Sequence, residues 1–232
     1  MPSEVVSELA ELEIRLGIEF HDPQLLKIAL VHPSLVNEKG IDRNQCNQRL
    51  EFLGDALIDL AVAEELYRRH PDWTEGRLTA ARAGLVNDET LAEIAAAMEI
   101  GNFLLMGRGE TAGGGRARPS NLADALEAIV GAVLLDAGYQ TASSLTLRLL
   151  ADRIDYAGRA SELNPKSKLQ ELVQRRSLKT PVYRTVETAG DPHTPSFHVE
   201  VMVDGRVVGT GFGPRKAIAE QEAASKALAE FL

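Results

Sequence analysis

Residues 49–59 read Arg-Leu-Glu-Phe-Leu-Gly-Asp-Ala-Leu-Ile-Asp, and this stretch decides how the first part of the chain is interpreted. It falls within a long predicted helix over residues 45–69. Glu51 and Asp55 stand four residues apart, so their carboxylates share one face of that helix. Like charges on one face repel, and apolar neighbours add a desolvation cost. A purely structural helix gains nothing from this arrangement, whereas a bound cation would remove both penalties.

A second pair of carboxylates, Asp124 and Glu127, stands three residues apart in the apolar segment 122–131. Four carboxylates on two helices are the oxygen donor set that a hard divalent ion prefers. Taken singly, each pair is more simply explained as a solvated helix face. Both pairs lie in the most apolar helices of the region, which favours a metal site, with Mg²⁺ acting on phosphate chemistry.

Composition and charge limit the classes of protein to consider. The chain has 232 residues, enough for one large domain, or for one domain with a small appendage. Cys46, its single cysteine, excludes a disulfide scaffold and a zinc site of paired thiolates. No apolar run approaches membrane-spanning length and the N-terminus lacks a secretory signal, so we expect a cytoplasmic protein without a membrane partner.

Net charge divides the chain into two parts. Residues 1–160 carry 15 Lys and Arg against 25 Asp and Glu, whereas residues 161–232 carry 10 against 9. The overall net charge of −9 speaks against nucleic acid, because phosphate contacts need cations. Residues 161–232 do not speak against nucleic acid in this way, because their positive and negative charges nearly balance. The charge distribution is consistent with two modules of different charge.

Hydrophobic periodicity predicts a mainly α protein with two domains. Residues 1–157 read as helices throughout, with a loop over residues 101–120, and residues 158–163 read as a polar linker. Residues 164–232 read as helix, three strands and helix, a small two-layer unit. Its expected strands are 182–188, 197–203 and 206–210, and Asp204-Gly205 predicts a tight hairpin between the last two.

Two segments carry a resemblance to a known family. Residues 47–56, Asn-Gln-Arg-Leu-Glu-Phe-Leu-Gly-Asp-Ala, resemble the signature of ribonuclease III, and residues 122–128 resemble its second carboxylate segment. The C-terminal unit resembles the double-stranded-RNA-binding domain of bacterial members. The resemblance implies an all-helical endonuclease domain that cleaves both strands of double-stranded RNA with Mg²⁺, or with Mn²⁺. It also implies 5′-phosphates, short 3′ overhangs, and ribosomal RNA precursors and structured messenger RNA as substrates.

The resemblance assigns roles in the first domain. It implies that Glu51, Asp55, Asp124 and Glu127 bind the metal, with Asp55 and Glu127 as the most sensitive catalytic residues. It further implies a homodimer in which Phe52 enters the partner subunit, although Phe52 as a core aromatic of its own chain stays open. Gln48 stands where the family usually has Glu, which removes a charge from an RNA-positioning site. Two other carboxylates at acidic family positions are expected on the surface, Glu75 and Glu110.

The resemblance also assigns the RNA contacts of the C-terminal domain. A helix contacts one minor groove, a loop at 191–193 enters the next, and a helix N-terminus grips phosphate. Here the usual consecutive lysines are replaced by Lys216-Ala217, which predicts weaker RNA affinity. The implied contact residues are Ser167, Gln170, Glu171, His193, Arg215 and Lys216.

Two rival functions remain. One is a non-catalytic double-stranded-RNA-binding dimer, against which the four carboxylates speak because they would repel phosphates. The other is a metal-dependent phosphohydrolase of small molecules, which would leave the RNA-binding unit without a purpose. Cleavage of a labelled RNA duplex with and without Mg²⁺ is the simplest assay that separates the endonuclease from these rivals.

Overall fold

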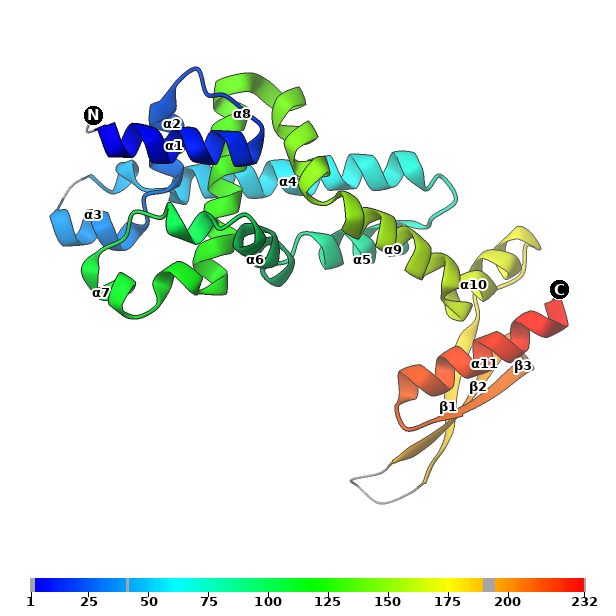
Figure 1. Cartoon of the computed structure of the whole chain (residues 1–232). Helices are drawn as coiled ribbons and strands as arrows, with labels where there is room; N and C mark the ends of the chain where they lie inside the picture. Colours follow the sequence, from blue (N-terminus) through cyan, green and yellow to red (C-terminus); the bar gives the residue numbers. More distant parts are fainter. Residues whose placement is uncertain (1–2, 41, 190–194, 232) are drawn as a thin grey trace. The chain divides into compact units, whose positions relative to one another are not determined.

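The computed structural model describes residues 3–40, 42–189 and 195–231 and divides into two compact units, Met1–Ile154 and Asp155–Leu232 (Figure 1). The first unit is helical, and the second combines helices with a sheet, as the sequence predicts. The helices, in chain order, are α1 (Ser3–Leu16), α2 (Pro23–Ala29), α3 (Pro33–Lys39), η1 (Arg43–Gln45), α4 (Gln48–Arg69), α5 (Glu75–Leu85), α6 (Asp88–Ala97), η2 (Ile100–Asn102), α7 (Arg108–Ala112), η3 (Gly115–Ala117), α8 (Pro119–Leu149), α9 (Ala151–Leu163), α10 (Pro165–Arg175) and α11 (Lys216–Phe231). The strands are β1 (Val182–Ala189), β2 (Ser196–Val203) and β3 (Arg206–Gly213).

Helices α4 and α8 form the centre of the first unit, where they pack against each other, and α6 packs on α8 (Figure 1). Leu57, Ile58 and Val62 of α4 and Leu126 and Ile129 of α8 are at most 4% exposed. Burying these aliphatic side chains removes apolar surface from water, which is the main favourable term in this packing. The two helices that carry the carboxylate pairs are therefore the core helices of the unit.

The structure differs from the sequence prediction in the loop 101–120, which contains three short helices. Glu110 holds this segment in place: its Oε1 accepts a hydrogen bond from Asn121 Nδ2 at 3.0 Å and pairs with Arg118 at 2.5 Å. Glu110 is thus an anchor for the start of α8 rather than a simple surface residue. The short helix α3 begins at Pro33 and ends before Gly40, which adopts the left-handed conformation.

Helix α9 runs through the segment that the sequence suggests as a linker. Residues 158–163 form its last turns, and the boundary between the two units falls after Ile154. No proline interrupts the segment before Pro165, and most of its residues tolerate helix, so the chain turns only at Asn164. There a new helix begins: Asn164 Oδ1 accepts a hydrogen bond from the Lys166 N–H at 3.0 Å.

The second unit is an antiparallel sheet in the order β1-β2-β3, covered on one face by α10 and α11. Asp204 and Gly205 both have positive φ, 49° and 78°, as a tight hairpin turn requires. The predicted hairpin between β2 and β3 is thereby confirmed. The core between helices and sheet contains Leu169, Val173, Val201, Val203, Ala223, Ala224 and Ala227.

Strand β3 continues beyond the predicted end at residue 210. A Cβ on Gly209 would lie 2.3 Å from the Ala223 carbonyl oxygen, and one on Gly211 would lie 2.1 Å from that of Ala219. Glycine on alternate residues of β3 therefore lets the backbone of α11 approach the sheet directly. The predicted strand ended too early because glycine has no side chain that favours a strand. In the structure, glycine is required at these positions because α11 lies so close to β3.

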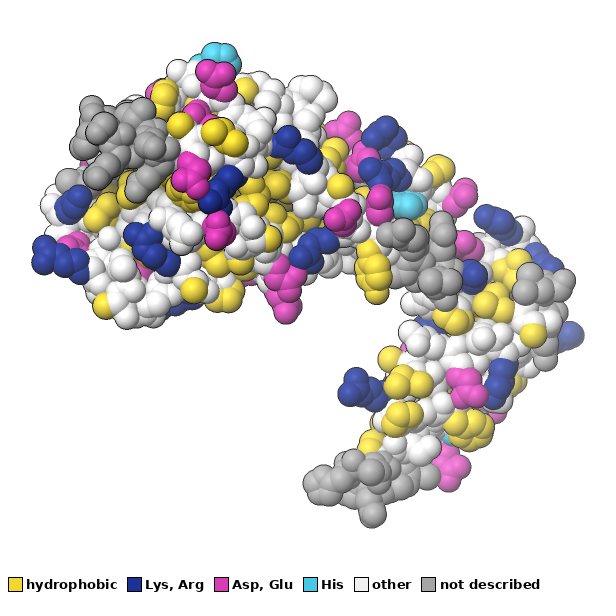
Figure 2. All heavy atoms as spheres, viewed as in Figure 1, with side chains coloured by type: hydrophobic (Ala, Val, Ile, Leu, Met, Phe, Trp, Pro, Cys, Tyr) yellow, Lys and Arg dark blue, Asp and Glu magenta, His cyan; other side chains and the backbone are white. Residues whose placement is uncertain are grey.

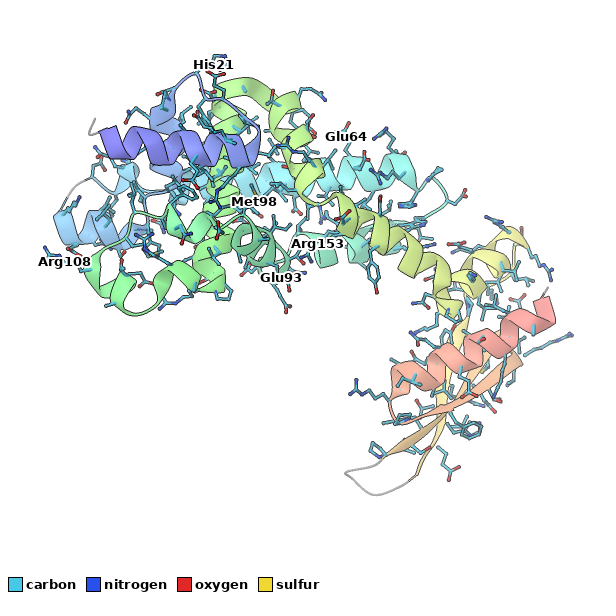
Figure 3. The ribbon with its side chains drawn as sticks, in the orientation of Figure 1. His21, Glu64, Glu93, Met98, Arg108 and Arg153 are labelled. Atoms are coloured by element: carbon cyan, nitrogen blue, oxygen red, sulfur yellow. The ribbon has the colours of Figure 1, made fainter. Side chains whose placement is uncertain are left out.

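The surface of the first unit mixes charges of both signs. On the face shown in Figure 2, its Lys and Arg side chains lie among Asp and Glu side chains. One such pair joins α9 to α6, where Arg153 Nη2 donates to Glu93 Oε2 at 2.6 Å (Figure 3). Among the described residues, no helix is long and apolar enough to cross a membrane.

Candidate active site

Three carboxylates from two helices meet at the crossing of α4 and α8. Glu51, Asp124 and Glu127 each offer an oxygen that lies within 4.8 Å of the other two. All three side chains are partly buried. The structure thus brings together residues that are 73 and 76 positions apart in the chain, from both pairs that the sequence singles out.

Two glycines allow the helices to approach this closely. A Cβ on Gly54 would lie 1.8 Å from the Glu127 carbonyl oxygen, and one on Gly131 would lie 2.1 Å from the Leu50 carbonyl oxygen. Real side chains never come this close to backbone, so only glycine fits at either position. Gly54 directly precedes Asp55, and Gly131 lies one helical turn after Glu127. These two close backbone contacts set the distance between the carboxylate pair of α4 and that of α8.

The electrostatics of the cluster are unfavourable without a cation. Burial, and then the charges of Asp55, Asp124 and Glu51, raise the pKa of Glu127 to about 8. Burial and the neighbouring Asp124 likewise raise the pKa of Glu51. A carboxyl group with a pKa near 8 is mostly protonated at neutral pH. The donor set therefore fits a divalent cation, which would both neutralise the charges and accept the oxygens.

Asp55 stands apart from the trio. Its side chain is exposed, and it is not among the three residues whose oxygens lie within 4.8 Å. Its charge still acts on the cluster, since it raises the pKa of both Glu51 and Glu127. Asp55 is thus placed beside the other carboxylates but on their solvent side.

Two residues that the sequence analysis did not select act on the same cluster. Burial, and then the charge of Asp88, raise the pKa of Asp124, and His32 opposes that rise. Asp88 is the first residue of α6, and its only sequence signal was that of a helix start. His32 is the N-cap of α3, where its Nδ1 accepts a hydrogen bond from the Ser34 N–H at 3.1 Å. Neither could be found from spacing, because both belong to other helices.

Phe52 and Gln48 both face solvent on α4. Phe52 is 79% exposed, so it is not a core aromatic of its own chain. Leu60 and Tyr67 lie further along the same helix and are 56% and 75% exposed. Gln48 opens the helix, and its Oε1 lies 3.6 Å from the Cys46 Sγ, which donates to it. Three large apolar side chains on one helix form an exposed apolar surface without a partner in the described part of this chain.

Apart from Gln48, the residues expected to contact RNA lie in the second unit. Ser167, Gln170 and Glu171 are partly exposed on α10, and Arg215 and Lys216 are exposed at the start of α11. The two helices pack together, so these side chains belong to one helical layer. His193, in the loop expected to enter a second minor groove, lies outside the described residues.

Comparison with known protein families finds a match for each of the two units. Residues 22–154 match the family model described as ribonuclease-III-like. The chain belongs to the ribonuclease III family. Residues 165–230 match the model of the double-stranded RNA binding motif. The chain thus combines the nuclease domain of this family of enzymes with a motif for double-stranded RNA, as the resemblance implied.

Individual relatives in the ribonuclease III family cover nearly the whole chain. Ribonuclease 3 of Heliobacterium modesticaldum is 42% identical over 96% of this chain and 94% of its own length. Ribonuclease 3 of Pelotomaculum thermopropionicum is 46% identical over 95% and 92%. A structure of the nuclease domain of Campylobacter jejuni ribonuclease III, concerned with flexibility in a region involved in dimer formation, matches with a TM-score of 0.57 and 44% identity, covering 61% of this chain and 95% of that one.

Proposed function

We propose that this protein is a Mg²⁺-dependent endonuclease that hydrolyses both strands of double-stranded RNA and leaves 5′-phosphates with short 3′ overhangs. The observation that carries the proposal is the meeting of Glu51, Asp124 and Glu127 at the α4–α8 crossing, with the pKa of Glu127 raised to about 8. Perturbed carboxylates gathered in this way are typical of catalytic sites. Mn²⁺, which accepts the same oxygen donors, is an alternative ion.

The chain's own residues would hold the ion and the substrate in place. Glu51, Asp124 and Glu127 supply the inner donor oxygens, and the exposed Asp55 completes the set from the solvent side. Glu127 must give up its proton to join this set, since the pKa of the free side chain is about 8. Bound Mg²⁺ supplies Lewis-acid stabilisation of the phosphodiester and a more acidic water. Asp55 and Glu127 are the residues we expect to be most sensitive to substitution.

The second unit would grip the duplex by its shape. Double-stranded RNA exposes 2′-hydroxyls and phosphates across a wide, shallow minor groove. Ser167, Gln170 and Glu171 on α10 are suited to the minor groove, and we propose that His193, which stands between β1 and β2 in the sequence, contacts the next one. Arg215 and Lys216 sit where the N-terminal end of α11 adds its own attraction for phosphate. Gln48 would position RNA at the catalytic unit by hydrogen bonding instead of by charge.

A homodimer explains how both strands are cut. Phe52 is 79% exposed, and Leu60 and Tyr67 extend the same apolar surface along α4. A second copy of the chain would bury these side chains, with Phe52 inserted into the partner. Two copies provide two carboxylate clusters, one for each strand. The Campylobacter relative, whose nuclease domain has a region involved in dimer formation, supports this assembly.

The wider role follows from the resemblance. We propose that ribosomal RNA precursors and structured messenger RNA are the substrates and that the protein acts in the cytoplasm. Cys46 is buried and unpaired, which is compatible with a reducing compartment.

Cleavage of an end-labelled RNA duplex tests the proposal. The wild-type protein should cut the duplex with Mg²⁺ and leave it intact with EDTA. Glu127→Gln should lose at least about 100-fold in cleavage rate and keep its duplex affinity, because only the metal donor set is damaged. Duplex binding without cleavage by the wild type would instead support the non-catalytic RNA-binding dimer. Native-rate cleavage by Glu127→Gln would remove Glu127 from the catalytic set.

A further inference from the structure

One carboxylate in the second unit is shared between two lysines at the expected RNA-binding surface. Glu220 of α11 accepts a hydrogen bond from Lys166 Nζ at 2.6 Å, and its other oxygen lies 3.9 Å from Lys216 Nζ. The Glu220 side chain is only 15% exposed, against 36% for Lys166 and 59% for Lys216. A carboxylate with this little exposure interacts with its cations more strongly than a surface pair does.

Lys166 is held from a second side as well. Its Nζ lies 4.7 Å from the centre of the Tyr183 ring, a cation–π distance. The Tyr183 hydroxyl is buried and has no hydrogen-bond partner among the described residues, and burial and the charge of Glu220 raise its pKa well above the ordinary value of a tyrosine. The Lys166 amine is therefore fixed between a carboxylate and an aromatic face. Lys216, at the longer distance and more exposed, is free to turn towards solvent.

Lys166 directly precedes Ser167 in α10, and Lys216, the first residue of α11, is itself expected to contact phosphate, so both lysines lie at the expected RNA-binding surface. We propose that Glu220 limits the grip on double-stranded RNA by keeping Lys166 paired within the protein and by partly neutralising Lys216. This inference rests on the proposed function. Each lysine that contacts phosphate releases counterions, and a lysine bound to Glu220 releases none.

The affinity for duplex RNA is therefore lower than the cations of this surface would give without Glu220. With Glu220 ionised, the local charge of Lys166, Lys216 and Glu220 is one positive unit; without it, the charge is two. Repeated turnover requires release of the cut duplex, so a weaker grip favours turnover. Glu220 acts through the two lysines, and it is a positioning residue and not a catalytic one.

Duplex affinity measured across a salt series tests the proposal. The probe is a fluorescent RNA duplex of about 20 base pairs, longer than the roughly 16 that such a domain spans, in EDTA so that it is not cut. Glu220→Gln should bind on the order of three- to tenfold more tightly at 0.1 M salt, as expected for one unit charge removed near the phosphates. Its slope of log affinity against log salt should steepen by roughly 1 unit.

Glu200→Gln is the matched control. Glu200 is 19% exposed and pairs with Arg184 at 2.8 Å, so it resembles Glu220 in burial and partner, and its loss changes net charge equally. It lies on β2 between the buried Val199 and Val201, and therefore on the sheet face away from α10 and α11. Its duplex affinity should stay within about twofold of wild type, since it is farther from the expected phosphates.

Two lysine variants test the same idea independently of how Glu220→Gln folds. Lys166→Gln should flatten the salt slope less than Lys216→Gln does, because the paired lysine makes no phosphate contact, whereas Lys216→Gln should flatten it by roughly 1 unit. Adding Lys166→Gln to Glu220→Gln should return the steepened slope to the wild-type value. In cleavage assays with Mg²⁺, Glu220→Gln should lower KM and leave the single-turnover rate at saturation unchanged.

The outcomes separate the two proposals. If the wild type binds the duplex and Glu220→Gln binds no more tightly, or if Lys166→Gln flattens the slope as much as Lys216→Gln does, the role of Glu220 is refuted and the proposed function stands. If the wild-type protein does not bind the RNA duplex at any salt concentration, both proposals fall.

Discussion

Gly54 and Glu127 touch through their backbones: a Cβ on Gly54 would lie 1.8 Å from the Glu127 carbonyl oxygen. This contact joins α4 to α8 at the level of the carboxylates. Gly131 makes the reciprocal contact with Leu50, so the two helices are locked together at two neighbouring points. The geometry of the cluster is therefore set by residues that have no side chain.

Replacing Gly54 by alanine should separate the two helices. The added methyl group meets backbone that cannot move aside, so we expect a loss of stability on the order of 3 kcal/mol and loss of cleavage. Urea unfolding followed by the fluorescence of Trp73, the single tryptophan, measures the first unit. Gly84→Ala in α5, where the new Cβ meets nothing within 4 Å, is the control and should stabilise by about 0.5–1 kcal/mol. Equal effects of the two substitutions would contradict the role of the crossing.

The stability of the metal-free protein should fall as the pH rises from about 4.5 to about 8. The pKa of Glu127 is about 8 in the folded chain against an ordinary value of 4.5, so the folded state holds an additional proton between these values. The stabilising contribution is complete below pH 4.5, declines progressively above it and is lost once the pH has passed about 8. Glu127→Gln removes this loss and should exceed the wild type by about 1–2 kcal/mol at pH 9, after allowance for partial exposure, and by little at pH 5.

Urea unfolding at a series of pH values in EDTA measures this difference. Adding Mg²⁺ at pH 9 should restore stability to the wild type and leave Glu127→Gln nearly unchanged, because ligand binding to the folded state alone stabilises it. Parallel pH profiles for the two proteins would show that Glu127 ionises normally and would speak against a strained cluster.

Phe52→Ala should weaken the proposed dimer by roughly 3–5 kcal/mol, the cost of a large-to-small change at a buried position, if the partner encloses the ring. The stability of the single chain should hardly change, since the ring is 79% exposed there. Sedimentation at decreasing protein concentration gives the dimer dissociation constant. Ile14→Ala, at a position 80% exposed on α1, serves as control and should leave the dimer intact. A tight dimer with Phe52→Ala would place the interface elsewhere.

A chain ending at Tyr156 should fold, dimerise and cut duplex RNA only at low salt. Loss of Arg215 and Lys216 removes about two phosphate contacts, so the slope of log affinity against log salt should flatten by roughly 2 units. Cleavage by the shortened and full-length proteins across a salt series measures this. Equal cleavage at every salt concentration would mean that the second unit does not grip the duplex. A folded dimer without cleavage at any salt would mean that the first unit cannot position RNA alone.

Much of this protein was readable from local sequence. The spacing of Glu51 with Asp55 and of Asp124 with Glu127 placed each pair on a helix face, and the Asp204-Gly205 turn predicted the β2–β3 hairpin. These features depend on residues a few positions apart, whose geometry follows from the helix and strand periods. The end of β3 was not predicted because its glycines are required by the close approach of α11, a helix that begins later in the chain.

The tertiary structure determined which residues far apart in the chain come into contact. Only the crossing of α4 and α8 shows that Glu51 joins Asp124 and Glu127 while Asp55 stays outside, and that Asp88 and His32 act on the same charges. Only the exposure of Phe52 excludes it from the core of its own chain, and only the packing of α10 on α11 brings Lys166 to Glu220. The sequence determines which face of a helix a side chain occupies, because that face follows from the helical period. Packing between helices determines what the face contacts, because these contacts join residues whose separation in the chain follows no regular period.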